Sequence, residues 1–107
     1  MTTWDTMYNS FKENPRNVQT HPLRNNSIPM WFYAYSDGSA ICIEVSRGEQ
    51  PSCSIKNRRK LEHDKFDKVF DIYLRREKGE SVTEEISLLT RQASYWFGVI
   101  YALEHGN

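Results

Sequence analysis

The residues best suited to chemistry in this sequence are cations concentrated in its second half. Residues 48–60 hold four cations against a single acid, Glu49. Lysine and arginine at this density can bind phosphate groups, with an affinity that falls as salt rises. The alternative is a solvated loop followed by a helix end whose dipole favours cations. The candidate nucleic-acid contacts are Lys56, Arg58, Arg59, Lys60, Arg75 and Arg76.

Aromatic rings form the second candidate group. Trp31, Tyr33 and Tyr35 alternate along a predicted strand, so their side chains point to one face. Such a ladder can stack nucleic-acid bases or line an apolar small-molecule pocket. It can also be a second core face or a subunit contact. The sequence leaves these three interpretations open.

Catalytic groups are sparse. Asp37 and Glu44 distantly resemble the acidic metal site of restriction-type nucleases, but Ser46 stands where that motif has lysine. The three histidines share no ligand spacing with each other or with the two cysteines, which we expect to be reduced thiols. We therefore predict no catalytic residue, no metal site and no cofactor, and we do not favour an enzyme.

The C-terminal segment 91–103 predicts a helix that is apolar on nearly every side, as buried helices are. Its small residues recur every fourth position, which predicts close packing of another helix, from this chain or a second copy. We expect a homodimer, since a two-fold dimer is the commonest symmetric assembly. The residues predicted to line a pocket or an interface are Trp31, Tyr33, Tyr35, Ser94, Trp96, Gly98 and Ala102.

A β-hairpin is predicted over residues 30–46, with Asp37 and Gly38 as its two turn residues. Cys53 to Lys56 is a candidate third strand. Residues 14–29, rich in Pro, Asn and Gln, are expected to be an irregular connection. The alternation assigns to the core face Met30, Phe32, Ala34, Ile41, Ile43 and Val45.

Helices are expected on both sides of the hairpin. An apolar face at helical spacing follows Thr2 and Thr3, either of which can cap a helix ended by Pro15. An amphipathic helix is predicted from about His63 to Lys78. Residues 81–84 read as a capping box opening a short helix through residue 89. These elements predict a single α+β domain over 1–107, with one N-terminal helix and three C-terminal helices.

Residues 83–94 resemble a helix-turn-helix, although the turn lacks glycine. Residues 81–107 carry one cation, Arg91, against three acids, and the second helix offers apolar rings rather than base-reading groups. We therefore interpret this segment as a helical packing corner. In its size and its aromatic hairpin followed by a short helical unit, the chain resembles the small proteins of mobile bacterial elements such as integron gene cassettes and prophages. That resemblance implies no site and no activity.

The charge total excludes a strong overall field, since 14 basic residues balance 14 acidic ones. No signal peptide or spanning segment is visible, so we expect a cytoplasmic protein without a membrane partner. The preferred function is a non-enzymatic interaction module that binds nucleic acid weakly and without sequence preference, or binds a protein. The alternative is a small-molecule-binding protein or minor enzyme with a pocket between the aromatic face and the terminal helix.

Overall fold

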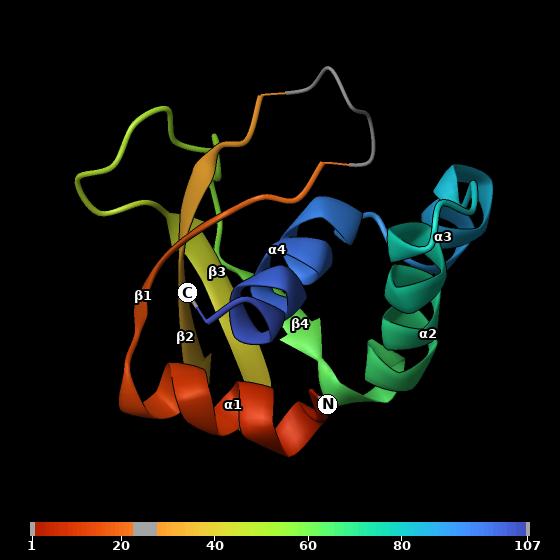
Figure 1. The fold of residues 1–107 in the computed structure, drawn as a ribbon. Helices are drawn as coiled ribbons and strands as arrows, with labels where there is room; N and C mark the ends of the chain where they lie inside the picture. Colours follow the sequence, from red (N-terminus) through yellow and green to blue (C-terminus); the bar gives the residue numbers. More distant parts are fainter. Residues whose placement is uncertain (1, 23–27, 107) are drawn as a thin grey trace.

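The computed structural model describes residues 2–22 and 28–106, and confirms the α+β class. A helix precedes four strands and three helices follow them (Figure 1). The elements are α1 Trp4–Glu13, β1 Arg16–Gln19, β2 Trp31–Asp37, β3 Ala40–Val45, β4 Arg59–Glu62, η1 His63–Lys65, α2 Phe66–Glu77, α3 Thr83–Leu89 and α4 Ala93–Glu104.

The four strands form an antiparallel sheet in the order β1-β2-β3-β4. The predicted sorting of β2 and β3 into two faces is confirmed at the centre of the hairpin. Phe32, Ala34, Ile41 and Ile43 lie on one face and are fully buried. Val45 was also assigned to this core face, but at the end of β3 it is 47% exposed.

The predicted turn is wrong by one position. Asp37 still belongs to β2 and pairs with Ala40, so Gly38 and Ser39 form the turn. A turn centred on Asp37 and Gly38 would need a positive φ at both residues. Among the described residues only glycines have positive φ, and Gly38 has φ 66°. Moving the turn by one position shifts the pairing by two residues, which leaves every side chain on its predicted face.

Both edge strands differ from the prediction. The third strand of the meander is β4 at Arg59–Glu62, whereas the predicted segment 53–56 contains no strand. The connection 14–29 contains β1, and its residues 23–27 lie outside the described part of the chain. Each edge strand buries a single side chain, Val18 in β1 and Leu61 in β4. Short strands rich in polar residues are typical of protected sheet edges.

Helices α1 and α4 cover the inner face of the sheet, the face of Phe32 (Figure 1). The ring of Phe32 contacts Tyr95 of α4 at 5.2 Å between centroids. Ser36, on the same face, donates a hydrogen bond to the backbone oxygen of Tyr8 in α1. Thr3 caps α1 as predicted, whereas no side chain caps α3, so the predicted capping box does not form. None of the helices in 2–22 and 28–106 is long and apolar enough to cross a membrane.

The terminal helix α4 is buried by its own chain, through contacts with β1, α1 and α2. Trp96 is fully buried in the core against Trp4 and Phe66, so its predicted place in a pocket or interface is wrong. The small-residue stripe of α4 consists of Ser94, Gly98 and Ala102. At Gly98 it packs against a strand, not against the predicted helix. A Cβ placed on Gly98 would lie 2.5 Å from the backbone oxygen of Gln19 in β1.

Candidate functional site

The three ladder rings lie on the outer face of the sheet, opposite to the side chains that contact α1 and α4. Strand alternation places Trp31, Tyr33 and Tyr35 there, and each is half-buried. In Figure 1, α4 lies in front of the sheet and α1 crosses its lower end, both on the inner face, while α2 and α3 lie to the side. The ladder is therefore not a second core layer within this chain.

Arg47 stacks on the middle ring of the ladder. Its guanidinium carbon lies 4.0 Å from the centre of the Tyr33 ring. The backbone of Arg47 is held by the Asn17 side chain of β1, through hydrogen bonds of 2.8 and 2.9 Å. These two bonds connect the loop after β3 to the far edge strand and so position the cation over the ring. The sequence pattern does not predict Arg47, because nothing in its spacing connects it to residues 17 or 33.

Arg58 lies beside the last ring of the ladder. Its Nη1 atom donates to the Tyr35 hydroxyl at 3.5 Å and to Asp37 Oδ2 at 3.2 Å. The Tyr35 hydroxyl in turn donates to the Glu44 carboxylate. Burial and this hydrogen bond raise the pKa of Tyr35, so its hydroxyl stays a donor at neutral pH. The partly exposed Arg58–Asp37 pair is weakly held, which leaves Arg58 able to exchange Asp37 for another anion.

Lys60 completes the cationic border of this surface. It pairs with Cys42 in the sheet register, and Cys42 pairs with Tyr35, so all three share the outer face. The Cys42 thiol is buried beneath these neighbours, and that burial raises its pKa and keeps it protonated. We call the surface the aromatic–basic face and define it as Trp31, Tyr33, Tyr35, Arg47, Arg58 and Lys60.

The other predicted cations do not join this face. Arg59 points to the opposite side, where its guanidinium lies 5.9 Å from the Tyr95 ring. Arg75 and Arg76 lie near the end of α2, roughly 14 Å along the helix from its first residue. Arg75 is paired with Asp71 and Glu85, and Arg76 with Glu77. Lys56 is exposed in the loop before β4.

Of the pocket predicted between the ladder and the terminal helix, only the part next to Trp31 forms. Tyr33 and Tyr35 cannot line it, because Phe32 and Ala34 occupy the side of β2 that faces α4. Trp31, however, lines a hollow of about 460 Å³ together with Gly98 and Ala102 of the terminal helix. Ser94 lines a different hollow, beside Cys53 and Tyr95.

The helix-turn-helix resemblance describes the local helices but not a DNA-reading surface. The elements α3 and α4 form as predicted, separated by a short turn. The second helix buries Phe97, Val99 and Ile100 in the core. A recognition helix must present its side chains to a groove, so the packing interpretation fits this arrangement.

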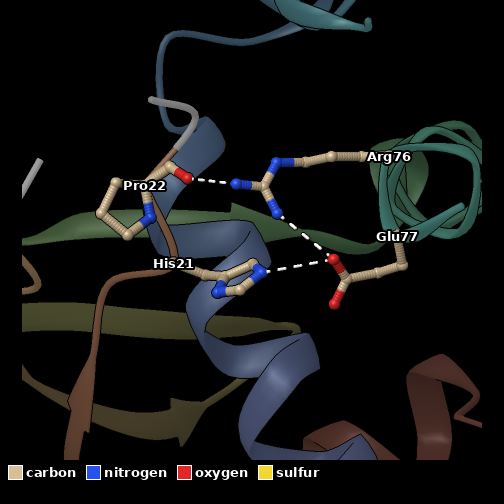
Figure 2. Close-up of polar contacts among 4 residues, drawn as sticks. All are labelled: His21, Pro22, Arg76 and Glu77. Atoms are coloured by element: carbon tan, nitrogen blue, oxygen red, sulfur yellow. Dashed lines mark hydrogen bonds and ion pairs between the residues drawn. The ribbon is translucent and has the colours of Figure 1, made fainter. Parts of the chain in front are cut away.

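A polar cluster connects the end of β1 to the end of α2 (Figure 2). His21 Nε2 lies 3.5 Å from Glu77 Oε2, and Arg76 lies 3.3 Å from the same carboxylate oxygen. Arg76 also donates to the backbone oxygen of Pro22. The His21 ring stacks on Tyr101 of α4 at 4.4 Å. Burial, and then the nearby Arg76, lower the pKa of His21, although Glu77 partly opposes the shift.

We expect the lowered pKa of His21 to make stability depend on pH. The unfolded chain binds a proton at His21 near its ordinary pKa of about 6.5, whereas the folded chain resists protonation. The free energy of unfolding should therefore fall as pH drops below about 6.5 and recover as pH rises. Thermal melts across this range should show a shallower slope for His21→Gln. Equal slopes for both proteins would rule out the assigned role.

Comparison with protein-family models, with curated proteins and with solved structures finds no match for this chain. The contacts and charges of the aromatic–basic face therefore carry the functional assignment.

Proposed function

We propose that this protein is a non-enzymatic module that binds single-stranded nucleic acid, without sequence preference, on its aromatic–basic face. The observation that carries the proposal is the arrangement of Trp31, Tyr33 and Tyr35 as half-exposed rings of one strand, bordered by three cations. Rings on a sheet surface with neighbouring cations are a recurring way to hold unpaired bases and their phosphates.

The contacts favour unpaired bases over a duplex. An aromatic ring can stack only on a base whose face is free, and Arg47 offers a planar guanidinium above Tyr33 as a further stacking surface. The second helix of the helix-turn-helix look-alike offers no comparable surface for a major groove, since α4 is buried. Every base has a flat face, so stacking of this kind discriminates little between sequences.

The charge of the chain limits the affinity. The net charge is zero, and Asp37 and Glu44 lie beside Arg58 and Tyr35 on the same face. A few phosphate contacts place the expected dissociation constant in or above the micromolar range, as for other non-specific binding. Binding should weaken steeply with salt.

The homodimer remains a prediction, and only one of its two original reasons still supports it. The terminal helix no longer requires a second chain, because its own chain covers it. The rings of the aromatic–basic face are the surface that a second copy would cover instead. Sedimentation of the free protein and of its complex with an oligonucleotide distinguishes the two uses, because a dimer through this face should dissociate when the oligonucleotide binds.

Fluorescence anisotropy of labelled oligonucleotides tests the proposed function. We expect single-stranded DNA or RNA to bind more tightly than a duplex of equal length, with an affinity that falls as salt increases. A mixed sequence and a homopolymer should bind within a few-fold of each other. Absence of salt-sensitive binding to any single strand, or a clear preference for duplex, would refute the proposal.

A further inference from the structure

We infer that the hollow between β1, Trp31 and α4 binds one unpaired nucleobase at the end of the aromatic–basic face. This inference rests on the function proposed above and adds a defined site to it. The chemical class of ligand is a neutral, planar heteroaromatic ring. Its source is either a base of the bound strand or a free nucleoside, and the experiment below separates the two.

The space for a base comes from the small residues of α4. Gly98 and Ala102 form part of the wall and have no side chain long enough to fill the hollow. Its volume is about 460 Å³, within the range of small-molecule sites. The small-residue stripe thus serves both the close contact with β1 and the hollow beside it.

The described lining is mainly apolar, with a few uncharged polar groups. Within the described ranges 2–22 and 28–106, its lining residues include no Asp, Glu, Lys or Arg. His21, the one titratable side chain other than Tyr101, has a lowered pKa and is neutral above pH 7. The His21 ring is held by Glu77 on one side (Figure 2) and by the stacked Tyr101 on another. A phosphate or carboxylate would lose its water here without gaining a cation from the described lining residues, which favours a neutral ligand.

Three side chains give the hollow the groups that a base needs. Trp31 forms part of the wall at the start of β2, and its indole is the ring on which we expect the base to stack. Gln19 is exposed and pairs with Trp31 in the sheet register, so its amide offers both a donor and an acceptor beside that ring. The Tyr101 hydroxyl supplies a further polar group.

The position of Trp31 connects the hollow to the proposed binding surface. It is the end ring of the Tyr35–Tyr33–Trp31 ladder and also part of the wall. Alternate residues of a strand are roughly 7 Å apart, so a nucleic-acid strand stacked on Tyr33 lies next to Trp31. The base beyond that ring is the one expected to enter the hollow.

Tryptophan fluorescence offers a direct readout. Trp4 is 8% exposed and Trp96 is fully buried, so a soluble ligand that quenches fluorescence on contact reports on Trp31. We expect adenosine to quench the wild-type protein saturably at millimolar concentrations. Gln19→Ala should weaken nucleoside binding at least about fivefold while changing oligonucleotide affinity only about twofold. Tyr33→Ala should do the reverse.

The possible outcomes distinguish a failure of the base site from a failure of the proposed single-strand binding. If oligonucleotides bind but adenosine neither quenches nor binds, the base site is refuted and the proposed function stands. If adenosine binds but no oligonucleotide does, the hollow is a nucleoside site and the proposed function fails. A short oligonucleotide with its terminal base removed separates the sources: weaker binding assigns the hollow to a base of the strand, and unchanged binding assigns it to free nucleosides.

Discussion

Replacement of Arg58 and Arg59 by glutamate is expected to lower the affinity for single-stranded nucleic acid by roughly 100-fold. Non-specific affinity is the sum of a few phosphate contacts, so the loss of the Arg58 contact, with two added negative charges that repel phosphate, removes most of it. Arg58 borders the ladder through Tyr35, and Arg59 follows it as the first residue of the edge strand β4. Anisotropy titrations at low salt measure the change.

Two controls test whether the loss of affinity arises at the aromatic–basic face. Arg91→Ala, in the turn before α4, removes a cation of the helix-turn-helix look-alike and should leave affinity nearly unchanged. Arg59→Glu alone should weaken binding less than Arg58→Glu, because Arg59 points to the side of Tyr95. Binding that survives the double reversal but is lost in Arg91→Ala would move the interface to the C-terminal helices.

Replacement of Gly98 by alanine is expected to destabilise the protein by about 1–3 kcal/mol through overpacking. Alanine is the better helix former by about 1 kcal/mol, so helix propensity alone predicts the opposite sign. The added Cβ would lie 2.5 Å from the Gln19 backbone oxygen and 3.2 Å from the Phe32 ring. A backbone atom within a sheet cannot move aside as the end of a flexible side chain can.

Thermal unfolding measures the Gly98 effect. For a domain of this size, each 1 kcal/mol lowers Tm by roughly 4–8 °C. Ser94→Ala, one turn earlier on the same stripe, is the matched control and should change Tm by only a few degrees. A Gly98→Ala protein that melts at or above the wild-type temperature would show that the contact between α4 and β1 is looser than described.

The sequence predicts the hairpin and the helices well because their signals are local. The alternation in residues 30–46 separates the buried Phe32 from the half-exposed Tyr33 without knowledge of the partner strand. The turn is misplaced because Asp37-Gly38 suits one kind of two-residue turn, whereas Gly38-Ser39, with glycine first, suits another. Both turns preserve the two faces.

The edge strands are harder to predict because each buries one side chain. Around Leu61, the cations Arg59 and Lys60 read as a polar loop, although they occupy an edge strand. The strand around Val18 is similarly hidden within a segment rich in proline and amide residues. Hydrophobic periodicity needs several buried positions before it can indicate a strand.

The assembly of the candidate site depends on loop paths that no local pattern encodes. Sequence analysis identified the ladder and the cations near residue 58 as separate features. Their meeting depends on β4 pairing with β3, which brings Lys60 opposite Cys42. The place of Arg47 depends on the Asn17 clamp, a contact between residues 30 positions apart. The burial of α4 was correctly expected, but the close contact at Gly98 is with β1 rather than with another helix.

Backbone amide NMR shifts on addition of a short single-stranded oligonucleotide test the central claim most directly. We expect the salt-sensitive shifts to cluster at Trp31, Tyr33, Tyr35, Arg47 and Lys60, on the outer face of the sheet. The exposed residues of α2 and α3 should not shift. Shifts centred on α3 and the turn before α4, or no shifts at low salt, would contradict the assignment of this face as the nucleic-acid-binding surface.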